Sequence, residues 1–142
     1  MNTRFSSLVA LKKNKMEQSE RLVQRANADL NTASSQLQAS YNSLEDVSIP
    51  DTGNISAFLA SRELLSTARR SIQHNQKWVE FTKEQVHLAR EKLKSDMIEH
   101  EKFKHLELVE IKKILLEQKR QEAKDLDEVA LMTYTKNSSK KG

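Results

Sequence analysis

The stretch that decides the fold is LSTARRSIQHNQKWVEFTKEQVHLAREKLKSD, residues 65–96, because large apolar residues recur in it every seven positions. These residues are Leu65, Ile72, Val79, Val86 and Leu93. Three positions after each of them stands a small or polar companion, at Ala68, Asn75, Thr82, Ala89 and Asp96. A sustained seven-residue repeat of this kind is typical of a coiled coil. The stretch therefore predicts a long helix that packs along a partner helix through a narrow seam.

The N-terminal part of the chain carries the same repeat. Its large positions are Val9, Met16, Val23, Leu30, Leu37 and Leu44, and its companions are Lys12, Ser19, Ala26, Ala33, Ser40 and Val47. Pro50 and Gly53 interrupt the chain between the two repeats, and Phe58 opens the second one. We expect one coiled-coil domain over residues 1–142, with helices over about 3–46 and 56–134, a loop over about 47–55 and a frayed tail over 135–142. Asn54 or Ser56 should cap the second helix.

The predicted fold is all-α, an antiparallel coiled-coil hairpin of two long helices with an overhanging C-terminal helix. One register sets a large residue against a small or polar one in every layer, and it places Ser40 opposite Leu65, Ser19 opposite Val86 and Asn2 opposite Phe103. In that register the helix has no partner after Phe103, over roughly 30 residues or about 45 Å. This overhang is rich in apolar residues, which predicts a binding surface or an oligomer contact. The apolar residues are Phe103, Leu106, Leu108, Val109, Ile111, Ile114, Leu115 and Leu116.

Composition excludes several classes of protein. Only 37% of the residues are hydrophobic and 31% are charged, which suits a thin helical rod better than a compact globule. The chain has no cysteine, so disulfides and thiol chemistry are excluded. Because no signal peptide or membrane-spanning stretch is recognisable, we expect a cytoplasmic protein. The net charge of +4 is mild and both signs are interspersed, so we expect no nucleic-acid partner.

No pattern points to catalysis, a cofactor or a metal. Gly53 is the only internal glycine, whereas a phosphate-binding loop needs several. The four histidines lack the four-residue spacing of a helical zinc site, and we expect them on solvated faces or at the seam edge. Trp78 flanks Val79 in the seam, where we expect packing cover more than a contact anchor. We predict that the protein is not an enzyme.

The chain resembles the FliJ family, a small cytoplasmic component of the flagellar type III export apparatus, over nearly its whole length. The resemblance rests on the opening Arg4-Phe5-x-x-Leu8, on the break near position 50 and on the run from Glu117 to Ala130. The Lys124-x-Leu126-Asp127-Glu128-x-Ala130 pattern is its most family-like piece.

This resemblance implies a non-enzymatic stalk that binds and stimulates the hexameric export ATPase and links it to FlhA, the membrane export gate protein. Export chaperones are further implied partners, and the location would be peripheral at the inner membrane. The ATPase-ring contacts implied are Phe5, Leu8, Leu108, Ile111, Leu115, Leu126, Asp127 and Glu128. The export-gate contacts implied are Tyr41, Leu64 and Ala68.

A generic dimerising coiled-coil scaffold is the alternative function. The stalk predicts a monomer in isolation that binds the ATPase, whereas the scaffold predicts a homodimer through residues 103–116. Whether the secretion system is flagellar or of the related virulence type stays open at the level of the sequence.

Overall fold

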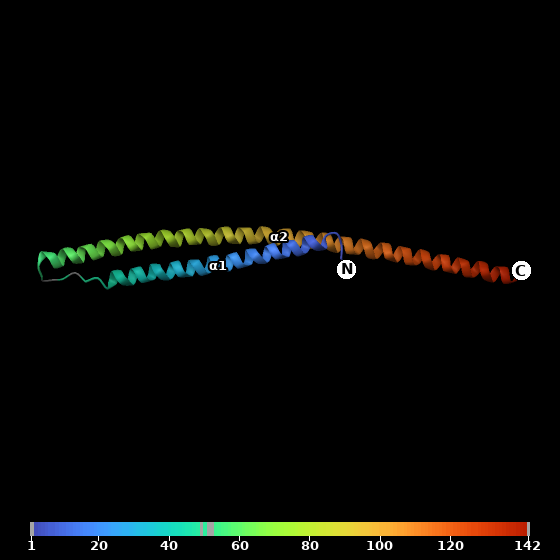
Figure 1. Ribbon diagram of the computed structural model, residues 1–142, viewed down its shortest axis with the longest axis horizontal. Helices are drawn as coiled ribbons and strands as arrows, with labels where there is room; N and C mark the ends of the chain where they lie inside the picture. The colour runs from blue at the N-terminus through green and yellow to red at the C-terminus, as the bar shows by residue number, and fades with distance from the viewer. Residues whose placement is uncertain (1, 49, 51–52, 142) are drawn as a thin grey trace. The chain divides into compact units, whose positions relative to one another are not determined.

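The computed structural model describes residues 2–48, 50 and 53–141, and over this part of the chain the fold is all-α, as predicted (Figure 1). Helix α1 spans Ser6–Glu45 and helix α2 spans Ile55–Lys141. Helix α2 thus continues through residues 135–141, where a frayed tail was expected. Residues 49, 51 and 52 of the expected loop and residue 142 of the tail lie outside the described residues. Among the residues described, no helix has a stretch long and apolar enough to cross a bilayer.

Side chains that bind the free backbone amides fix the start of α1. The Phe5 amide donates to Thr3 Oγ1 at 3.1 Å, and the Thr3 amide donates to Ser6 Oγ at 2.8 Å. Such a reciprocal pair satisfies two amides that have no partner within the helix. The helix therefore begins a few residues later than position 3.

Helix α2 begins at the predicted cap. The Ala57 amide donates to Asn54 Oδ1 at 2.9 Å, and the Phe58 amide donates to the Asn54 carbonyl at 3.3 Å. Gly53 precedes the cap with a φ of 156°, a conformation that residues with a side chain rarely adopt. Asn54 rather than Ser56 thus caps the helix, and the glycine lets the chain enter it.

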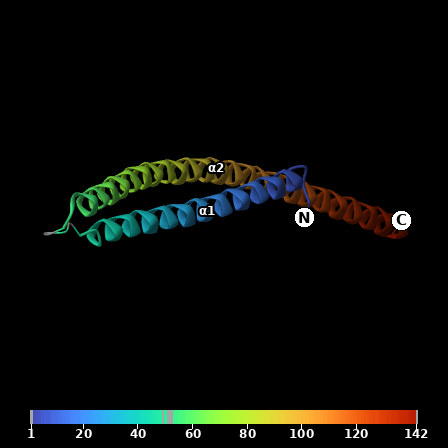
Figure 2. The same ribbon diagram turned by 60° about the vertical axis from the view of Figure 1, so that its left-hand side comes forward.

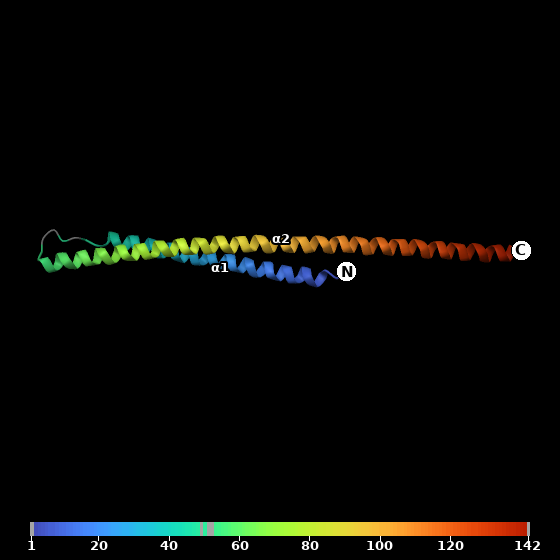
Figure 3. The ribbon, with the colours of Figure 1, turned by 90° about the horizontal axis from the view of Figure 1, so that it is seen from above.

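The chain divides into two compact units. Unit 1 comprises residues 1–13 and 98–142, and unit 2 comprises residues 14–97. Within unit 2, Ser19 of α1 contacts Asp96 of α2, and Ser40 contacts Asn75. The two helices of unit 2 therefore run in opposite directions alongside each other, as two views of the ribbon also show (Figures 1 and 2). Seen from above, the part of α1 in unit 2 crosses from one side of its α2 partner to the other (Figure 3).

The interface of unit 2 is thin and half polar. Its buried apolar residues are Ala33, Ile72, Val79 and Val86, and its buried polar residues are Ser19, Ser40, Thr82 and Asp96. All eight belong to the two predicted stripes, so the heptad pattern identified the packed faces. Phe58, predicted to open the second stripe, is instead half exposed, because the packed face starts at Ser61 and Leu65.

The predicted register is wrong. Ser19 donates a hydrogen bond to Asp96, ten residues beyond the expected Val86. Ser40 accepts from Asn75 and lies 3.4 Å from Ser71 Oγ, ten and six residues beyond the expected Leu65. The offsets of six and ten residues lie on either side of seven, so the pairing is displaced by about one heptad. Such a displacement still sets large residues against small ones. The apolar stripes cannot distinguish such registers, and the buried polar pairs do.

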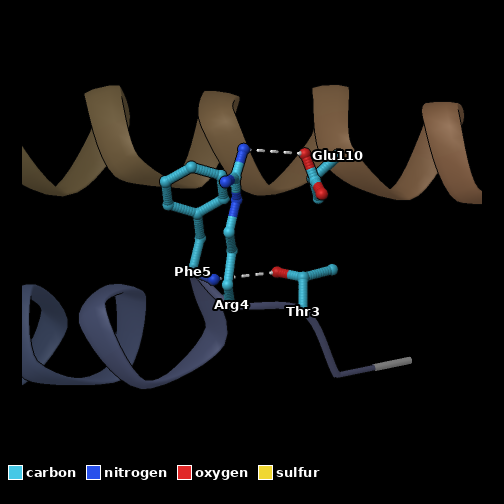
Figure 4. Close-up of polar contacts among 4 residues, drawn as sticks. All are labelled: Thr3, Arg4, Phe5 and Glu110. Atoms are coloured by element: carbon cyan, nitrogen blue, oxygen red, sulfur yellow. Dashed lines mark hydrogen bonds and ion pairs between the residues drawn. The ribbon is translucent and has the colours of Figure 1, made fainter.

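In unit 1, α1 also pairs with residues further along α2 than the sequence predicted. Lys12 Nζ lies 3.8 Å from Glu99 and 5.4 Å from the centre of the Phe103 ring, so Phe103 faces Lys12 and not Asn2. Further along, an Arg4–Glu110 ion pair of 3.5 Å joins the start of the chain to α2 (Figure 4). Helix α2 therefore has a partner well beyond Phe103, and the unpaired stretch begins later than predicted.

Candidate interaction surfaces

The C-terminal part of α2 in unit 1 forms one continuous exposed segment. Every residue from 115 to 138 is exposed, whereas Glu110, Ile111 and Ile114 are still partly covered. At 1.5 Å per residue, the exposed segment is about 35 Å long. Its large apolar side chains are Leu115, Leu116, Leu126, Val129, Leu131, Met132 and Tyr134. So many exposed apolar groups on one helix indicate a contact surface.

The residues implied as ATPase-ring contacts divide into two groups within unit 1. Leu108 and Leu115 are about half exposed, and Ile111 is partly covered. Leu126 is 70% exposed and is followed by the exposed carboxylates of Asp127 and Glu128. A shallow hollow that includes Asp127 and Glu128 is also lined by Leu131 and Met132. Apolar and acidic groups therefore lie together on this helix.

Phe5 and Leu8 stand at the beginning of α1. The guanidinium of Arg4 lies 5.0 Å from the centre of the Phe5 ring, and the same side chain reaches Glu110 of α2 (Figure 4). Phe5 is partly covered and Leu8 is 37% exposed. The structure thus brings Phe5 close to the Arg4–Glu110 pair, while Leu126, Asp127 and Glu128 lie more than 15 residues further along α2.

The residues implied as gate contacts lie in unit 2. The Tyr41 hydroxyl accepts a hydrogen bond of 2.9 Å from Gln76 Nε2, and Tyr41 lines a groove with Leu37 and Lys83. Leu64 is exposed and Ala68 is partly covered by the interface. Ser40, the residue before Tyr41, lies 3.4 Å from Ser71, so this end of α1 lies about one helical turn beyond Ala68 along α2. The three residues therefore belong to the same part of unit 2.

An exposed aromatic pair on α2 went unrecognised in the sequence. Trp78 and Phe81 stack with ring centres 5.3 Å apart, and both are about half exposed. Their three-residue spacing on a helix is the one signal that could have predicted the contact. Trp78 is therefore more exposed than the packing role predicted for it requires.

Comparison with known families identifies the chain. Among the described residues, no group of three or more histidines, cysteines and carboxylates is placed to hold a metal ion. Neither the curated proteins nor the solved structures contain a match. The family model described as the flagellar FliJ protein matches residues 1–139. The chain therefore belongs to the FliJ family of flagellar proteins, a family of non-enzymatic components of flagellar protein export.

Proposed function

We propose that this protein is the stalk of the flagellar type III export apparatus, binding and stimulating the hexameric export ATPase and linking it to the export gate protein FlhA. Family membership over residues 1–139 supports the export role. The single observation that carries the mechanical part is the exposed segment of α2, residues 115–138. The stalk is peripheral to the inner membrane and meets export chaperones there.

The architecture that suits this role is an antiparallel coiled-coil hairpin with a C-terminal overhang. Opposed helix directions in unit 2 and the heptad stripes support the hairpin. The overhang is the part of α2 beyond the Arg4–Glu110 pair, about one heptad shorter than the sequence predicted. A single helix is narrower than a helix pair, so the overhang can enter the lumen of a ring. Its exposed apolar and acidic groups would then face the lumen wall.

The ATPase ring contacts the overhang through Leu115, Leu126, Asp127 and Glu128, with Leu108 and Ile111 at its base. Leu126 is the best anchor, because it is the most exposed leucine of the chain and two carboxylates follow it. Phe5 and Leu8 complete the contact from the start of α1. The gate contact is separate, at Tyr41, Leu64 and Ala68 in unit 2.

The binding test captures purified hexameric export ATPase on the immobilised protein and compares Leu126→Glu with wild type. We expect at least a tenfold loss of affinity, since a charge replaces an apolar group that packing would desolvate. Leu88→Glu is the matched control, because Leu88 is a half-exposed leucine on α2 in unit 2. Equal binding by wild type and Leu126→Glu would contradict the ring contact, and no binding by either would contradict the stalk.

The gate contact has its own test with the cytoplasmic part of FlhA. Leu64→Glu should weaken binding to FlhA and leave ATPase binding unchanged, because Leu64 lies in unit 2 and is exposed. Leu126→Glu should show the opposite pattern. If the two variants affect both partners equally, the division of the chain into a ring end and a gate end is wrong.

A further inference from the structure

One face of the exposed part of α2 carries a heptad repeat that is distinct from the face packed on α1. We name it the C-terminal stripe, and its members are Leu108, Lys112, Leu115, Lys119, Glu122, Leu126, Val129 and Thr133, at alternating spacings of four and three. Leu115 stands five residues after Glu110, which pairs with Arg4 of α1. Five residues rotate a helix by about 140°, so the stripe points away from the α1-bound face.

The C-terminal stripe is complementary to itself when two copies lie antiparallel. With the twofold axis between Arg120 and Gln121, Leu115 of one copy faces Leu126 of the other, and Lys119 faces Glu122. The next layers pair Val129 with the long apolar stem of Lys112, and Leu108 with Thr133. Leu108, Leu115, Glu122 and Val129 are the first positions of their heptads, and the other members of the stripe are the fifth positions. Each layer sets a first position of one copy against a fifth position of the other, as in antiparallel coiled coils.

Charge selects this arrangement over the parallel one. In a parallel pair, Lys119 would face Lys119 and Glu122 would face Glu122, and like charges in a helix seam are unfavourable. The antiparallel pair turns both layers into Lys–Glu contacts. All four side chains at the centre, Leu115, Lys119, Glu122 and Leu126, are exposed in the single chain and available for pairing.

We propose that a second copy of this chain binds antiparallel along the C-terminal stripe, giving a reversible homodimer through α2. Only a few heptads are involved and the two central layers are charged, so the pairing is weak and depends on concentration. This departs from the monomer in isolation that the stalk function predicts. The dimer covers Leu115 and Leu126, so self-pairing and ATPase binding exclude each other; this last consequence rests on the proposed function.

Sedimentation velocity of the purified chain alone, over a concentration series, tests the pairing. Lys119→Glu and Glu122→Lys should each weaken the dimer at least tenfold, because each creates like-charge layers. Mixing the two variants should restore a heterodimer, and the double variant K119E/E122K should again form a homodimer. A wild type that stays monomeric over the whole series, or single variants that dimerise like wild type, would overturn the proposal.

Cysteine cross-linking then tests the direction, since the chain has no cysteine of its own. A mixture of Leu115→Cys and Leu126→Cys chains should form a disulfide between the two variants under mild oxidation. Leu115→Cys alone should not, whereas a parallel dimer would cross-link it readily. Both positions are exposed, so neither change disturbs the fold. These measurements use no ATPase, so their failure leaves the stalk function standing, and failure of ATPase binding leaves the dimer standing.

Discussion

Two polar contacts between α1 and α2, one buried and one partly buried, favour the observed pairing of the helices in unit 2. Ser19 is 1% exposed and donates to the carboxylate of Asp96, which is 7% exposed. Asn75 donates to Ser40 and, at 3.4 Å, to the Gln36 carbonyl. A buried polar group without a partner costs free energy, so any register that separates these pairs is disfavoured.

Ser19→Ala should lower the free energy of unfolding by about 1–3 kcal/mol, because it leaves a buried carboxylate oxygen without its donor. Urea unfolding followed by circular dichroism measures the change. Ser35→Ala is the matched control, since Ser35 lies on the exposed side of the same helix and its loss should be close to neutral. If the two variants unfold at the same urea concentration, the Ser19–Asp96 contact contributes nothing to stability.

At the scale of the helices, the sequence predicts which face of each helix is buried better than it predicts which residues contact each other across the interface. The seven-residue stripes identified the buried residues Ala33, Ile72, Val79 and Val86 correctly, because burial follows helix periodicity. They could not predict that Ser19 meets Asp96, because a slip of one heptad preserves the pattern of large and small layers. Choosing between such registers needs the buried polar contacts, which are pairwise and leave no periodic signal.

The candidate surfaces were predictable to a similar degree. The apolar positions of the overhang stood out in the sequence, and Leu108, Leu115 and Leu116 are exposed as a contact surface requires. The exposed segment starts later than predicted because the register differs from the predicted one. The wrong register therefore also gave the wrong start. The Trp78–Phe81 stack was missed because a helical spacing of three is common and does not by itself predict that two rings touch.

Engineered disulfides distinguish the two registers directly. Ser19→Cys combined with Asp96→Cys should form an intramolecular disulfide, because the two side chains are in contact. Ser19→Cys combined with Val86→Cys should not, since those residues are about a heptad out of register. The two pairs differ in one position, so the second is a control for the first. Rapid oxidation of the Ser19–Val86 pair, with none in the Ser19–Asp96 pair, would restore the register predicted from the stripes.

For the molecule as a whole, the proposed function gives the two units separate tasks. Unit 1 has the exposed segment of α2, where the proposed ring binding and the proposed self-pairing would use the same leucines. Unit 2 offers Tyr41, Leu64 and Ala68 along a half-polar interface. A protein built in this way can connect two partners, because each contact needs only one face of a helix.

ATP turnover by the hexameric export ATPase, titrated with the 142-residue chain, tests the stalk function most directly. Wild type should raise the turnover to a saturating level, and Leu88→Glu should match it. Leu126→Glu should need at least tenfold more protein for the same effect, because its anchor in the ring is charged. Unchanged turnover at saturating wild-type protein, or equal stimulation by wild type and Leu126→Glu, would contradict a stalk that acts through the C-terminal part of α2.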